Sequence, residues 1–179
     1  MNNKRAGAMG ALAVFAAAAI LLGLAGSQAS AAPRQDTNAA LGFAKLQTLV
    51  GTWEATTEKG RVTTTYESVS KGTALLERMK VPGETEMVTL YHLDGGNLVL
   101  THYCSAGNQP HMQAGPFDPA RNQLVFNFAG GGNLQDPNVG HMHSAVFTFT
   151  GPDEFTSQWT FQQGGQARFT ENMQFHRVK

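Results

Sequence analysis

The chain has 179 residues, of which 41% are hydrophobic and 15% are charged, and its formal net charge is zero. This balance lacks the broad cationic face that nucleic-acid binding needs, so we expect no nucleic-acid partner. The single cysteine, Cys104, has no second cysteine with which to form an internal disulfide.

The first 31 residues have the pattern of a secretory signal peptide. Lys4 and Arg5 give a short basic start, an apolar run follows over 11–24, and the small-x-small motif of signal peptidase ends at Ala31. The apolar run is shorter than the roughly 20 residues of a membrane span, which is the alternative. We therefore expect a secreted or periplasmic protein with no membrane span after cleavage. A flexible tether over 32–38 and a single domain over 39–179 would follow.

The domain is expected to hold one short helix and then only strands. Asn38 can cap a helix over 39–49, and from Gly51 the hydrophobic pattern changes from helical to alternating. Many short strands joined mainly by hairpins, with no second helix, are typical of an antiparallel β-barrel or sandwich. We expect ten strands, over 51–58, 61–68, 73–81, 86–93, 98–104, 112–117, 122–128, 141–150, 154–162 and 166–177.

Three tight turns predict which residues face each other, at Lys59-Gly60, 94–97 and 151–153. In each hairpin the apolar residues of both strands then share one face, which supports the register. The expected pairs are Trp53 with Tyr66, Ala55 with Thr64, Leu93 with Leu98, Tyr91 with Leu100, Thr89 with His102, Met87 with Cys104, Phe149 with Phe155, Phe147 with Ser157, Ala145 with Trp159 and His143 with Phe161.

The connections divide between two ends of the barrel because successive strands alternate in direction. The end with the turn at 59–60 also holds 82–85, 105–111, 129–140 and 163–165, while the other end holds tight turns. Long loops at one end predict an open mouth, with the glycine-rich segment 129–140 as a flexible flap over it.

Gly51-Thr52-Trp53 begins the first strand, and Arg177 ends the last. In a closed barrel these strands are neighbours, so the guanidinium group can stack on the indole ring. The arrangement resembles the lipocalin superfamily, in which such a pair plugs the closed end. The resemblance implies a structural role for Trp53 and Arg177 and an all-β, antiparallel, lipocalin-like barrel.

A wider resemblance covers 46–177 through the motifs GTWE, TTTYE, GTALLE and THYC followed by NQP. These motifs are similar to those of a family of small secreted bacterial proteins without assigned function, which implies a barrel but no activity. The nitrobindin group, haem-binding barrels that begin Gly-x-Trp, is more distantly similar and implies haem binding as an alternative. Those proteins carry glycines after the tryptophan and a haem-ligating histidine early in the last strand. In this chain the residues after the tryptophan, 54–57, are Glu-Ala-Thr-Thr and include no glycine. The early part of the last strand, 167–171, reads Ala-Arg-Phe-Thr-Glu and includes no histidine. His176 comes later and points outward with Gln174.

Polar side chains share the inward faces with apolar ones, and a buried imidazole or carboxylate needs a partner. We therefore expect the interior to bind a small, partly apolar ligand. Its mouth would be lined by Met87, Thr89, His102, Cys104, His141, His143 and Phe161, and its depth by Tyr66, Glu77, Tyr91, Trp159 and Glu171.

Other interpretations of these polar residues stay open. His141 and His143 lie on one side of a strand and could share a Zn²⁺ ion, with Cys104 or His102 as a third ligand. A metal-dependent or acid/base enzyme could use these histidines and a carboxylate, or the pair Glu77 and Glu171. A hydrogen-bonded polar pocket, rim histidines or a solid structural core are further alternatives. No residue is assigned as catalytic, and no cofactor is assigned.

The outward face of one expected hairpin is apolar. If nothing covers it, this face is a candidate homodimer interface. Its residues are Val88, Leu90, Val99 and Tyr103.

Overall fold

The structure is a computed structural model that describes residues 38–136 and 138–179. Helix α1 (Asn38–Gln47) comes first, and one 3₁₀ turn, η1 (Ser70–Gly72), separates two of the strands. The strands are β1 (Gly51–Thr57), β2 (Gly60–Val69), β3 (Ala74–Lys80), β4 (Met87–Asp94), β5 (Asn97–Tyr103), β6 (Gln109–Ala114), β7 (Gln123–Gly132), β8 (His141–Phe149), β9 (Glu154–Gln163) and β10 (Gln166–Arg177).

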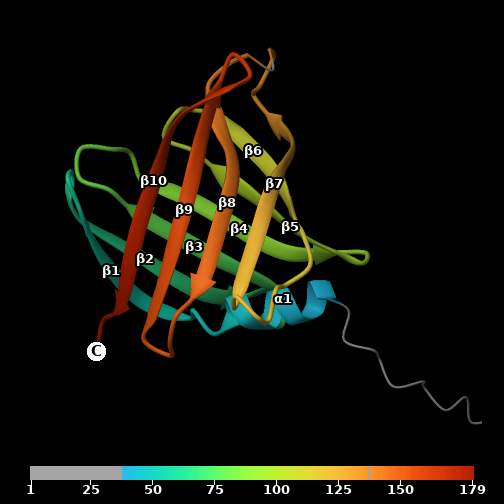
Figure 1. Cartoon of the computed structure of the whole chain (residues 1–179), viewed down its shortest axis with the longest axis vertical. Coiled ribbons are helices and arrows are strands. Elements are labelled where there is room, and N and C mark those ends of the chain that lie inside the picture. The colour runs from blue at the N-terminus through green and yellow to red at the C-terminus, as the bar shows by residue number, and fades with distance from the viewer. Residues whose placement is uncertain (1–37, 137) are drawn as a thin grey trace, which may run out of the picture. The chain divides into compact units, whose positions relative to one another are not determined.

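The ten strands form a closed antiparallel barrel, which confirms the predicted all-β fold (Figure 1). Each strand pairs with the next along the chain, and β10 returns to pair with β1. Alternate residues are buried along much of the sheet, as Trp53 and Ala55 are in β1, because successive side chains point to opposite faces. The expected signal peptide and tether lie outside the described residues, apart from Asn38, with which α1 begins. Within the described ranges, no helix is long and apolar enough to cross a membrane.

Helix α1 and Arg177 close one end of the barrel. Figure 1 shows α1 across this end, and Leu46 and Leu49 are buried against the core. The Trp53 indole Nε1–H donates a hydrogen bond of 2.6 Å to the Leu49 carbonyl, and the Arg177 guanidinium group lies 4.1 Å from the indole centroid. The stacking expected from the sequence is therefore present.

Gly51 makes room for this arrangement. Its φ of 130° is a value that residues with side chains rarely adopt, and a Cβ there would lie 2.8 Å from Arg177 Nη1. The glycine before the tryptophan thus lets the arginine reach the carbonyls of Thr48 and Val50, to which it donates hydrogen bonds of 2.9 and 2.8 Å.

Two of the three predicted registers hold along most of their length. Thr89 pairs with His102 and Tyr91 with Leu100, while Ala145 pairs with Trp159. The β1–β2 register was predicted wrongly, because the two-residue loop is Glu58-Lys59 rather than Lys59-Gly60. Trp53 therefore lies opposite Thr64 instead of Tyr66, and Ala55 lies opposite Val62. The shift of two residues keeps every side chain on its predicted face.

A bulge at His143 changes the start of β8. The register shifts between Met142 and Ser144, so Met142 and not His143 lies opposite Phe161. An extra residue in one strand breaks the alternation of faces, which periodicity alone does not reveal.

The segment predicted as a flap is partly strand. β7 continues to Gly132 and pairs with β6, whose range is 109–114 instead of the predicted 112–117.

Candidate functional site

A cavity of about 260 Å³ lies within the barrel at the end opposite α1. It is lined by the ends of strands and by the connections after β1, β3 and β5. Its residues are Thr57, Lys59, Val62, Met79, Val81, Glu84, Met87, Thr89, His102, Cys104, Ser105, Ala106, Met142, Trp159, Phe161, Phe169, Glu171 and Met173. The open end that loop lengths predicted is therefore the end that contains the cavity.

Methionine and aromatic side chains form most of the apolar wall. Four methionines line it, and thioether side chains are flexible and polarizable, so they adapt to irregular ligands. Phe161 and Phe169 are stacked with their ring centroids 4.9 Å apart. Phe169 is 46% exposed, so this pair brings the aromatic wall out to the mouth.

His102 and Trp159 are two aromatic lining residues that carry polar ring atoms. The imidazole Nδ1 is hydrogen-bonded to Thr89 Oγ1 at 2.9 Å, and the two rings lie against each other with centroids 4.8 Å apart. Within the described part of the chain, neither His102 Nε2 nor Trp159 Nε1 has a hydrogen-bond partner, although both atoms are buried. A buried polar atom without a partner costs about 1–3 kcal/mol, so a ligand that supplies one gains from it. Burial lowers the pKa of His102 to about 4, so the imidazole is neutral at pH 7.

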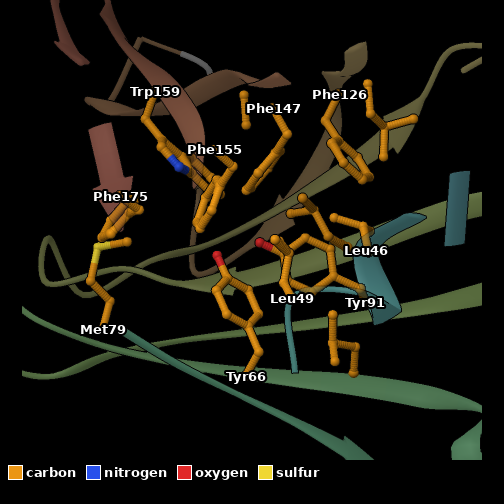
Figure 2. Close-up of a cluster of buried hydrophobic side chains, with 14 of the residues drawn as sticks. Leu46, Leu49, Tyr66, Met79, Tyr91, Phe126, Phe147, Phe155, Trp159 and Phe175 are labelled. Carbon is orange, nitrogen blue, oxygen red and sulfur yellow. The ribbon is translucent and has the colours of Figure 1, made fainter. Parts of the chain in front are cut away.

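A buried carboxylate lies one layer deeper. Glu77 accepts hydrogen bonds from the hydroxyls of Tyr91 (2.6 Å), Tyr66 (3.0 Å) and Thr64 (3.2 Å). Burial raises the pKa of Glu77, and the bonds from these hydroxyls oppose the rise. Figure 2 shows the Tyr66 and Tyr91 hydroxyls directed toward one point beneath the aromatic cluster. Glu77, Tyr66 and Tyr91 are therefore beneath the cavity and not in its lining.

An ion-pair cluster lies at the mouth. Lys59, in the β1–β2 loop, has its ammonium group 2.8 Å from Glu84 Oε1 and 3.1 Å from Glu171 Oε1. The hydrogen bonds that the ammonium group donates to Glu84 and Glu171 raise the pKa of Lys59, and the same lysine lowers the pKa of Glu84. Ser105 also donates a hydrogen bond to Glu84, of 3.1 Å. The cluster joins three connections of the barrel around the opening.

His141 and His143 form a separate cluster with Phe128. His141 Nε2 and His143 Nδ1 are 3.2 Å apart, and the Phe128 ring packs against both imidazoles. Neither histidine lines the cavity, which corrects their predicted place, because the bulge at His143 turns Met142 to the cavity instead. The third histidine considered, His102, is hydrogen-bonded to Thr89 in the cavity wall. The described residues contain no group of three or more His, Cys, Asp or Glu side chains placed to hold a metal ion. Within the part of the chain that the structure describes, the three histidines considered for zinc are therefore not brought together.

Among the described residues, the side chains considered for a carboxylate pair, a reactive cysteine and haem ligation are placed as follows. Glu77 and Glu171 bind different partners, in the core and at the mouth. Cys104 lines the cavity, but burial raises the pKa of its thiol, which disfavours the reactive thiolate. No histidine occurs over 167–171, and His176 is exposed on the outer surface beside Glu154. The residues present therefore do not fit haem ligation in the nitrobindin manner.

Seven of the twelve predicted ligand-binding residues line the cavity: Met87, Thr89, His102, Cys104, Trp159, Phe161 and Glu171. Sequence reasoning missed Lys59 and Glu84, although both lie in connections that it assigned to the mouth. It also passed over Met79 and Met173, which share inward faces with residues that it chose. The assignment of loops to the mouth could have identified Lys59 and Glu84, and the alternation of faces could have identified Met79 and Met173.

A search of the chain against protein-family models finds no match, and a search against curated proteins finds none either.

Proposed function

We propose that this barrel binds a small, partly apolar molecule in the cavity opposite α1. The observation that carries the proposal is the wall of the cavity, which is largely apolar but includes His102 and Trp159, whose buried ring nitrogens Nε2 and Nε1 have no hydrogen-bond partner among the described residues. Ligand sites are commonly apolar pockets with a few polar groups that fix the orientation of the ligand. A molecule with an apolar body and a hydrogen-bonding group satisfies both parts of this wall.

We also propose that the protein is exported and that its barrel is related to the lipocalins. The N-terminal pattern supports export to a secreted or periplasmic location, and the Trp53–Arg177 contact supports a lipocalin-like relationship. Tyr103 is 51% exposed on the outer face of β5, which keeps the apolar face of that hairpin as the candidate dimer interface.

Binding can be tested with N-phenylnaphthylamine, a neutral probe whose fluorescence rises in apolar surroundings. We expect saturable binding by the mature protein at one probe per chain. Replacing Met142, at the edge of the cavity, by tryptophan adds volume inside it and should weaken binding at least about tenfold.

A matched control places the same new side chain outside the barrel. Tyr103→Trp, on the outer face of β5, should bind the probe as the wild-type protein does. Thermal unfolding of both variants shows that each is folded. The proposal is wrong if binding is not saturable, or if folded Met142→Trp keeps full affinity.

A further inference from the structure

The charges around the cavity are unbalanced. Among the described residues that line it, Lys59 is the only one with a fixed positive charge, and it is bound between the two acidic residues Glu84 and Glu171. The side chains of these acids are 27% and 35% exposed, so each can still meet a ligand at the opening. Arg168 lies by the β9–β10 turn near Gly164 and does not line the cavity. The mouth therefore has one more negative than positive charge.

The deeper groups add no positive charge. Three hydroxyls bind the Glu77 carboxylate beneath the cavity, and none of these donors carries a charge. The imidazole of His102 is neutral at pH 7. An anionic ligand would therefore have to draw Lys59 away from the carboxylates of Glu84 and Glu171. It would also bring a negative charge close to these carboxylates and to Glu77.

The wall also presents aromatic faces next to this negative mouth. Trp159, Phe161 and Phe169 line the cavity, and Glu171 lies opposite Trp159 in the β9–β10 pairing. The faces of such rings attract cations, and tryptophan attracts them most strongly. Carboxylates beside aromatic rings form an environment that favours an ammonium group over a neutral or anionic group.

We infer that the cavity binds an apolar molecule that carries a positive charge, a hydrophobic amine. Its ammonium group lies at the mouth between Glu171 and Glu84, where it shares these carboxylates with Lys59. Its apolar body extends between the methionines and Trp159. This inference rests on the proposed function, since it specifies the class of ligand for the same cavity.

The test compares three probes that share one apolar body: phenylbutylamine, phenylbutanol and phenylbutyrate. Calorimetric titration of the mature protein at pH 7 and low salt should give the tightest binding for the amine. An exposed ion pair together with a cation–π contact corresponds to an affinity about tenfold above that of the alcohol. The carboxylate should bind most weakly. Added salt should reduce the advantage of the amine, because it screens charges at the exposed mouth.

Two variants change the charge of the mouth in opposite directions. Glu171→Gln removes a negative charge and should weaken amine binding about threefold, whereas Lys59→Gln frees both carboxylates and should strengthen it by a similar factor. Binding of the alcohol should change little in either variant. A matched control, Glu154→Gln, removes an acidic residue that pairs with His176 and lies outside the cavity, so it should leave the preference intact.

The outcomes separate this inference from the function on which it rests. Saturable binding of the alcohol with equal or weaker binding of the amine overturns the charge preference and leaves ligand binding in place. If the two mouth variants shift amine binding in the same direction, the assigned place of the ammonium group is wrong. Failure of all three probes and of N-phenylnaphthylamine to bind overturns both proposals.

Discussion

At the scale of single residues, one transverse row of side chains connects the core to the cavity. Tyr66, Glu77, Thr89 and His102 lie opposite one another across β2, β3, β4 and β5. Of these four residues only His102 has a buried polar atom, Nε2, without a hydrogen-bond partner among the described residues. The pairing of Thr89 with His102 followed from the hairpin turn at 94–97. The binding of Glu77 by two tyrosines did not, because it depends on side-chain reach between strands whose register had been predicted only in part.

His102 should make the stability of the protein depend on pH. In the unfolded chain its imidazole takes up a proton near pH 6.5, but in the folded protein burial lowers its pKa to about 4. Between these values the unfolded state binds more protons, so the free energy of unfolding should fall as the pH is lowered from 6.5 to 4, by about 3 kcal/mol. Urea unfolding across this range measures the loss.

The variant His102→Gln isolates this contribution. The raised pKa of Glu77 has the opposite effect. Its carboxyl group binds a proton more readily in the folded state than in the unfolded state, so this group increases the free energy of unfolding as the pH falls. The difference between the wild-type and variant profiles removes what is common to both. If the two profiles run parallel from pH 6.5 to 4, His102 is not held neutral by the fold.

At the scale of elements, the ends of strands decided which predictions succeeded. The existence of ten strands, their order and their faces followed from alternation and turn residues. The extra residue at His143 and the choice of loop between β1 and β2 did not, because a two-residue shift keeps every side chain on its face and alternation does not show where an extra residue is inserted. The bulge mattered for the site, since it replaced two predicted histidines by Met142.

The attachment of α1 to the barrel depends on Arg177. Besides the contact with Trp53, its guanidinium group donates hydrogen bonds to the carbonyls of Thr48 and Val50, just after α1, and to Asp153. Arg177→Ala should therefore lower the free energy of unfolding by about 2–4 kcal/mol, through loss of charge-assisted hydrogen bonds and the cation–π contact. Urea unfolding at pH 7 measures the change.

A second arginine provides the control for this prediction. Arg61 is also paired with a carboxylate, Glu54, but at 3.6 Å and with its side chain 72% exposed. Arg61→Ala should cost less than about 1 kcal/mol, as exposed ion pairs contribute little. Equal losses in the two variants would show that Arg177 acts only as a surface charge.

At the scale of the whole molecule, the barrel is closed unequally around its circumference. Strands β9 and β10 pair from Gln166 to His176, whereas within the described chain the β1–β10 pairing includes only Trp53 with Arg177 and Glu54 with His176. Both pairs lie near the α1 end. Toward the mouth, Thr57 and Met173 from the two sides of this seam line the cavity, and the Lys59–Glu171 ion pair spans it. The cavity therefore lies beside the strand pair that has the fewest paired residues among the described strands.

This seam should be the first part of the barrel to open. Backbone amides of β10 between Thr170 and Phe175 that point toward β1 should exchange with solvent faster than those that bond to β9, so protection should alternate along the strand. Hydrogen exchange followed by NMR resolves these amides one by one, and β9, which is paired on both sides, provides the protected reference. Lys59→Gln removes the ion pair across the seam and should speed exchange of the β1-facing amides without affecting the others. Uniform protection along β10 would contradict this prediction, because it would mean that the wall is equally closed on both sides of the strand.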